Sequence, residues 1–155
     1  MAGSVISATT GAVVGATRRS AKEDRFLRDA EALLDAARAH FDQGRTDLAL
    51  EDAYRAALRT AGAISARSTV LARKKRLPTN AWDKLRLTGG EGAHWAGEFS
   101  SFSALRGRVA LGIEDRPSRL DTQRLISLAG AFYGHAVYGD SGYPISGGGA
   151  VAEAA

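Results

Sequence analysis

The clearest candidates for a binding site are four consecutive cationic residues, Arg73, Lys74, Lys75 and Arg76. Clustered cations on a loop can contact several phosphates and release the counterions of a nucleic acid, which gives salt-sensitive binding with little sequence preference. Trp82 follows closely and could stack on a base. Two alternatives stay open. The run could contact an acidic protein, or it could have no specific role and only keep a loop solvated while Trp82 belongs to the core.

The positive charge of the chain is concentrated around this run. The 155 residues carry a formal net charge of +4. Between Arg67 and Arg86 there are seven basic residues and a single acid, Asp83, so this segment alone carries +6. The remainder of the chain is therefore slightly acidic, and the basic character is local.

A second set of polar residues lies on two later segments with helical periodicity: His94, Glu98, Arg106, Asp121, Arg124 and His135. Antiparallel packing of these segments would bring Arg106, which lies near the centre of an apolar stripe, close to Asp121 and Arg124. His94 and His135 would then meet at the other end, about 18 Å away. Either Arg106 and Asp121 form a partly buried ion pair with the histidines at the rim, or the set lines a polar groove for a phosphate or nucleotide, completed across a dimer.

The composition excludes several chemistries. There is no cysteine, so the chain has no disulfide, thiolate metal site or cysteine nucleophile, and we expect it in a reducing compartment, the cytoplasm. The three histidines lack the spacing of a metal motif, and Gly89–Gly92 lacks the Gly-Lys-Ser/Thr of a phosphate loop, so we expect no metal and no cofactor. No stretch approaches 18 consecutive apolar residues, which argues against a membrane span.

Helical periodicity, capping residues and glycine breaks predict how these residues are positioned. The expected helical segments run from the capping box Ser20-x-x-Glu23 to Gly44, from an N-cap at Thr46 to Arg67, over a short stretch capped by Thr79 or Asn80, from about Trp95 to Gly112, and from Ser118-x-x-Asp121 to Tyr138. No segment alternates with a period of two. The sequence therefore predicts an all-α fold, an antiparallel up-and-down bundle of four long helices and one short helix over 20–138. We expect a disordered leader at 1–19 and a flexible Gly/Ala-rich tail at 139–155.

The order of several motifs resembles a known family. Residues 53–63 read Ala-Tyr-Arg-Ala-Ala-Leu-Arg-Thr-Ala-Gly-Ala, the basic linker 73–76 follows, then Asn80-Ala81-Trp82, and then His94-Trp95-Ala96-Gly97-Glu98-Phe99. This layout, over roughly the middle two-thirds of the chain, is similar to the short actinobacterial SAV-like branch of the HEPN superfamily. The resemblance implies a helical bundle that is often dimeric and an association with RNA or nucleotides. Many members of the superfamily are metal-independent ribonucleases of toxin–antitoxin or defence systems.

The sequence departs from the Arg-x(4–6)-His motif of the active members. Ten residues separate Arg124 from His135, and seven separate Arg86 from His94, so no pair fits and no catalytic residue can be assigned. The leading hypothesis is a non-catalytic HEPN-like module, expected to be a homodimer, that binds RNA, a nucleotide or a partner protein through its basic linker. One alternative is a divergent ribonuclease that uses Arg106 or Arg124 with His94 or His135 across a dimer. Another is a purely structural assembly subunit.

Overall fold

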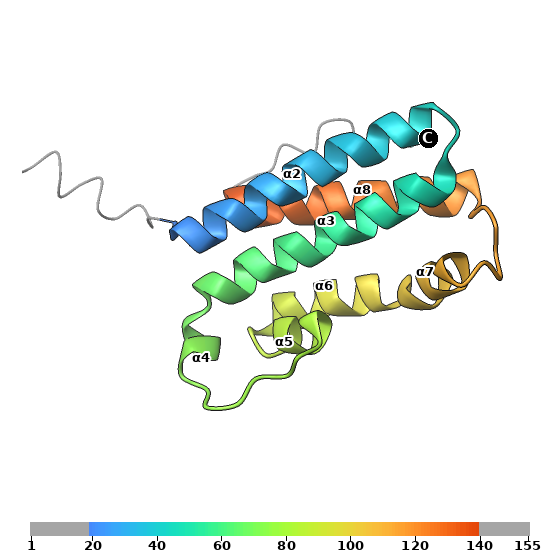
Figure 1. The fold of residues 1–155 in the computed structure, drawn as a ribbon. Coiled ribbons are helices and arrows are strands. Elements are labelled where there is room, and N and C mark those ends of the chain that lie inside the picture. Colours follow the sequence, from blue (N-terminus) through green and yellow to red (C-terminus); the bar gives the residue numbers. More distant parts are fainter. Residues whose placement is uncertain (1–18, 140–155) are drawn as a thin grey trace, which may run out of the picture.

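The computed structural model describes residues 19–139, which form a succession of seven helices (Figure 1). These are α2 (Ala21–Asp42), α3 (Thr46–Arg67), α4 (Thr69–Ala72), α5 (Ala81–Arg86), α6 (Gly90–Ser100), α7 (Ser103–Ala110) and α8 (Arg119–Tyr138). The described part contains no strand, which confirms the all-α prediction. None of its helices combines the length and the apolar character that a membrane span needs. Apart from residues 19 and 139, the predicted leader and tail lie outside the described residues.

Side-chain caps begin three of the helices where the sequence predicts them. The backbone N–H of Glu23 donates to the Ser20 hydroxyl at 3.1 Å at the start of α2, and Ser118 accepts from Asp121 in the same way at the start of α8. Asn80 caps α5, accepting from the N–H groups of its first turn. Such caps satisfy backbone donors that have no partner inside the helix. At α3 the prediction is wrong by one residue, because Thr46 is already helical and Arg45 precedes it without a side-chain cap.

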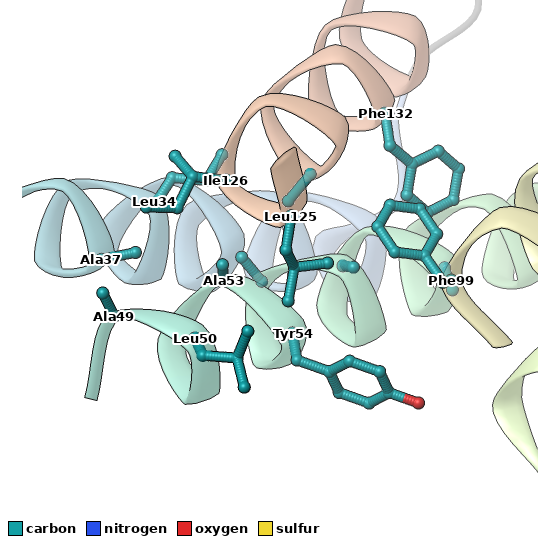
Figure 2. Close-up of a cluster of buried hydrophobic side chains, with 14 of the residues drawn as sticks. Leu34, Ala37, Ala49, Leu50, Ala53, Tyr54, Phe99, Leu125, Ile126 and Phe132 are labelled. Carbon is teal, nitrogen blue, oxygen red and sulfur yellow. The ribbon is translucent and has the colours of Figure 1, made fainter. Parts of the chain in front are cut away.

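Three long helices form the framework of the bundle. α2 and α3 run antiparallel and meet at Gly44, whose φ of 77° favours glycine, and α8 lies against both of them (Figure 1). Buried alanines line the shared faces, Ala37, Ala49 and Ala53 among them (Figure 2). Small side chains let the helix axes approach closely, and larger ones such as Leu125 fill the space that remains.

Aromatic rings pack the other side of α3, where α5 and α6 lie. The rings of Trp82 and Phe99 are stacked with centroids 5.1 Å apart, and Phe132 of α8 lies 4.9 Å from Trp95. The indole N–H of Trp82 donates to the hydroxyl of Tyr54 at 2.8 Å, so this buried donor has a partner. The aromatic residues therefore join α3, α5, α6 and α8 into one core.

The fourth long helix predicted from about Trp95 to Gly112 is not continuous. α6 ends at Ser100 and α7 begins at Ser103. Three serine hydroxyls donate to carbonyl oxygens around the break: Ser100 to Ala96, Ser101 to Glu98 and Ser103 to Ser100, at 2.6–2.7 Å. Serine hydroxyls that bond to nearby carbonyls compete with the regular helix ladder and favour bends. α7 ends at Ala110, short of the predicted end at Gly112, and Ile113 beyond it is 70% exposed.

Two arginines hold the C-terminal end of α8 against the start of α2 and the end of α3. Arg67 donates to the carbonyl of Ala136 at 2.6 Å and to the carboxylate of Glu23 at 3.3 Å. Arg19 donates to the carbonyl of Val137 at 3.0 Å. Cations near a helix C-terminus satisfy its free carbonyls and interact favourably with the helix dipole. This end of the bundle is thus fixed by charge as well as by packing.

We expect two glycines of α6 to respond oppositely to replacement by alanine. A Cβ on Gly92 would collide with the carbonyl oxygen of Leu85 and the hydroxyl of Thr88, so Gly92→Ala should lower the free energy of unfolding by about 1–3 kcal/mol. A Cβ on Gly97 meets no atom within 4 Å, so Gly97→Ala should raise it by about 0.5–1 kcal/mol. Urea titration followed by circular dichroism measures both changes. A neutral Gly92→Ala would contradict the close packing of α6 on α5.

Candidate functional site

The run Arg73–Arg76 lies on the loop between α4 and α5, hereafter the basic loop, residues 73–80 (Figure 1). All four cationic side chains are exposed. None of them forms an ion pair or a side-chain hydrogen bond with any other described residue. Their charges are therefore not neutralised by acids of the described chain, and they are available to an anion from solvent.

Both ends of the basic loop are anchored by buried side chains. Leu71 precedes the loop, Trp82 follows it, and each is 4% exposed. The first turn of the loop keeps a backbone hydrogen bond from Lys74 N–H to the Leu71 carbonyl at 3.1 Å. Because Trp82 is enclosed by Tyr54 and Phe99, it is not available to stack on a base, and the expectation that it joins the binding residues is wrong. The alternative, that Trp82 belongs to the core, is the one the structure supports.

Further cations lie beside the loop, in a place that the sequence did not predict. A hollow of about 290 Å³ between α2, α3 and residues 71–84 is lined by Lys22, Phe26, Thr79 and Lys84 among others. A second hollow of about 270 Å³ is lined by Lys22, Arg25, Phe26, Asp29 and Arg59. The two share Lys22 and Phe26, and we call them together the basic groove.

The sequence signal for the basic groove was weak. Lys22 and Arg25 stand on the first turns of α2, and Arg59 is one of several charged residues along α3. Lys84 is one of the seven basic residues between Arg67 and Arg86, outside the consecutive run. Each residue by itself is typical of a solvated helix face. Only the fold brings α2, α3 and α5 together, so the sequence alone gave no reason to group them.

The guanidinium of Arg106 has a different partner from the one predicted. It binds the carboxylate of Glu51 on α3 with two hydrogen bonds of 2.8 Å, and it lies 4.5 Å from the centroid of the Tyr54 ring. Asp121, the expected partner, instead pairs weakly with Arg124 on its own helix at 3.8 Å. The physical reason is that α7 packs against α3, which brings Arg106 to Glu51. A cleft of about 360 Å³ between α3 and α7 surrounds the Glu51–Arg106 pair.

The contact between Glu51 and Arg106 shifts the pKa of each group in the direction expected for a charge-assisted hydrogen bond. The hydrogen bonds from Arg106 lower the pKa of the Glu51 carboxyl below its ordinary value of 4.5, against the opposing effect of partial burial. The same contact raises the pKa of Arg106. Glu51 was not among the site residues singled out from the sequence, because its partner lies 55 positions away.

His94 in the first half of α6 and His135 near the end of α8 both lie beside Trp95. Nε2 of His135 lies 3.1 Å from the Glu91 carboxylate, and its ring packs 5.6 Å from that of Trp95. His94 is exposed, with its ring 5.9 Å from the same indole, and Glu98 is exposed as well. The six residues predicted as a polar groove are therefore distributed over separate ion pairs and surfaces. Within residues 19–139 no group of three His, Asp or Glu side chains is arranged to hold a metal ion.

Comparison with protein families gives one match. A family model described as HEPN_SAV_6107-like HEPN matches residues 43–136, which is more than half of the chain. The matched segment runs from just before α3 into the last turns of α8, so it includes the basic loop and leaves α2 outside. Searches of the curated proteins and of the solved structures found no match.

We expect the Glu51–Arg106 pair to contribute to stability in a pH-dependent way. The two side chains are 39% and 35% exposed, so a double-mutant cycle with Glu51→Gln and Arg106→Gln should give a coupling of only about 0.5–1 kcal/mol at pH 7. Because the pKa of Glu51 is lowered by folding, the unfolded chain binds the proton first as the pH falls. The contribution is complete above about pH 4.5 and is lost as the pH falls through the pKa of the folded carboxyl.

Urea titrations of the four proteins of this cycle at pH 7 and pH 3 measure the effect. The matched control is the same cycle with Asp121→Asn and Arg124→Gln, a pair on one helix that is more exposed and should show little coupling. A coupling for Glu51 and Arg106 that is equal at the two pH values would contradict the assignment.

Proposed function

The chain belongs to the SAV_6107-like HEPN family, and we propose that it is a non-catalytic member that binds RNA through the basic loop. One observation carries the proposal: four consecutive cations, Arg73 to Arg76, are exposed and have no acidic partner among the described residues. Cations arranged in this way neutralise several phosphates of a polyanion and release its counterions. Contacts of this kind favour binding with little sequence preference.

RNA suits the basic loop better than the other two ligands considered. A free nucleotide carries its phosphates at one end, whereas four cations along a loop can engage several phosphates of one strand. An acidic protein would gain little affinity from exposed surface pairs, and stable protein interfaces depend on buried aromatic and apolar anchors. The large apolar residues beside the run are Leu71, which is buried, and Val70 and Leu77, which are 45% and 41% exposed and belong to no buried cluster.

A divergent ribonuclease has less support from the arrangement of its candidate residues. Arg106 is held by Glu51 and His135 pairs with Glu91, while Arg124 pairs weakly with Asp121 and His94 is exposed without an ion pair among the described residues. A nuclease that used Arg106 or His135 would have to release that group from its carboxylate partner. A homodimer, which the family resemblance implies, would serve the proposed function by presenting two basic loops to one RNA chain and raising the effective concentration of the second contact.

Reversing the four charges together (Arg73→Glu, Lys74→Glu, Lys75→Glu, Arg76→Glu) should abolish binding of a generic single-stranded RNA at about 50 mM salt. A matched comparison separates local charge from net charge. Lys74→Glu/Lys75→Glu should weaken binding at least about tenfold and reduce the dependence on salt, while Arg45→Glu/Arg116→Glu, two exposed cations elsewhere, should change it little. Fluorescence anisotropy with labelled RNA measures all of these affinities.

Three outcomes would contradict the proposal. The wild-type protein could fail to bind RNA at low salt, the Arg45/Arg116 variant could weaken binding as much as the loop variant, or an acidic peptide could compete better than RNA. Gel analysis of the recovered RNA tests the ribonuclease alternative in the same samples. Cleavage that disappears in His94→Ala or His135→Ala would favour that alternative instead.

A further inference from the structure

The basic groove concentrates positive charge, since the described residues that line it include four cations and one acid. Its four cations come from three helices: Lys22 and Arg25 from α2, Arg59 from α3 and Lys84 from α5. None of the four has an ion pair or a side-chain hydrogen bond within residues 19–139. The acid lining these hollows is Asp29. Like charges gathered in a concave surface focus a positive potential there, so the groove favours an anionic ligand.

The shape of the groove favours a narrow ligand. Its two hollows, of about 290 and 270 Å³, are joined at Lys22 and Phe26 and are close to the size of small-ligand pockets. A nucleic-acid duplex is stiff and presents its phosphates on a wide convex surface. A single strand is flexible and can place a phosphate and a base in a hollow of this size.

Phe26 offers an apolar surface in the middle of the groove. Its side chain packs on α3 at Gly62, where an added Cβ would lie 2.7 Å from the ring. The ring is partly buried against the core, and it lines both hollows. Aromatic rings beside a cationic groove are the usual stacking surfaces for bases of single-stranded nucleic acids. Phe26 can therefore fill the role that the buried Trp82 cannot.

The groove is continuous with the basic loop. Leu71, Leu77 and Thr79, which flank or belong to the loop, also form part of the wall of the larger hollow. In Figure 1 the loop and the start of α2 lie at the same end of the molecule, with the last turns of α3 between them. A chain bound to the loop can thus extend along the groove without leaving the positive surface.

We propose that the basic groove binds a segment of single-stranded nucleic acid, with phosphates on Lys22, Arg25, Arg59 and Lys84 and a base on Phe26. This inference rests on the proposed function and deepens it, because it names the form of nucleic acid that the protein selects. Lys22, Arg25 and Phe26 lie on α2, outside the residues that match the family. Arg59 and Lys84 lie within the matched residues, so the groove combines α2 with two helices of the matched segment.

The test compares a labelled single-stranded RNA with a duplex of the same sequence, by anisotropy over a series of salt concentrations. The wild-type protein should bind the single strand more tightly. Lys22→Gln/Arg25→Gln and Arg59→Gln/Lys84→Gln should each weaken the single strand about tenfold and lower its salt dependence by about 1.4 in log–log slope, with a smaller effect on the duplex. Arg45→Gln/Arg116→Gln, which removes the same charge elsewhere, should leave the preference unchanged.

Phe26 is tested separately because its change should not alter the salt dependence. Phe26→Leu should weaken binding of the single strand several-fold at constant slope, and Phe26→Tyr should restore it. Circular dichroism melting of each variant checks that the fold is kept. If Phe26→Leu has a lowered melting temperature, the charge variants and Phe26→Tyr still test whether the groove binds the single strand.

The outcomes separate this inference from the proposed function. If the groove variants bind like the wild type while the loop variants lose RNA, the groove inference fails and the proposed function stands. If the wild-type protein binds no RNA, both fail. Equal affinity for single strand and duplex, or equal losses for both in the groove variants, overturns the inference. If the wild-type protein binds an acidic peptide more tightly than RNA, and the groove variants lose that binding, the result overturns the inference in favour of a protein partner.

Discussion

The hydrogen bond between the Trp82 indole and the Tyr54 hydroxyl is the contact on which the position of the candidate site depends. A buried indole N–H without a partner would be costly, and here the phenol accepts it while Phe99 stacks on the ring. This contact fixes α5 to α3 and α6, and with it the end of the basic loop. Leu71 anchors the beginning of the same loop. A loop held at both ends presents its cations with less loss of conformational freedom on binding than a free one would.

In the described chain some cations pair with acids, and others, including those of the basic loop and the basic groove, do not. Along much of the bundle arginines meet acids, as in the pairs of Arg67 with Glu23, Arg86 with Asp83 and Arg106 with Glu51. Along the basic loop and the basic groove the cations stand without such partners. This face therefore gathers cations in a chain whose net charge is only +4, and gathered cations attract anions.

Local features of the fold could be predicted from the sequence, and long-range ones could not. The caps at Ser20 and Ser118 act within three residues, so the pattern alone indicates where α2 and α8 begin. At the break after Ser100, serine hydroxyls donate to backbone carbonyls. The periodicity of apolar residues in the sequence does not reveal these hydrogen bonds. Arg106 meets Glu51 across 55 positions, and the groove joins α2 to α5, so both needed the assembled bundle. The role of Trp82 could not be predicted for the same reason. A tryptophan near a cationic run in the sequence is compatible with a surface that stacks on bases and with a place in the core.

The most direct test of the central claim is a map of the RNA-binding surface by NMR, with the full chain isotopically labelled and titrated with a short single-stranded RNA. If the basic loop and the basic groove act together, amide shifts should concentrate in the first turns of α2, the second half of α3 and residues 71–84. The cleft around Glu51 and Arg106 should stay unchanged. Shifts centred on that cleft, or on His94 and His135, would contradict the account.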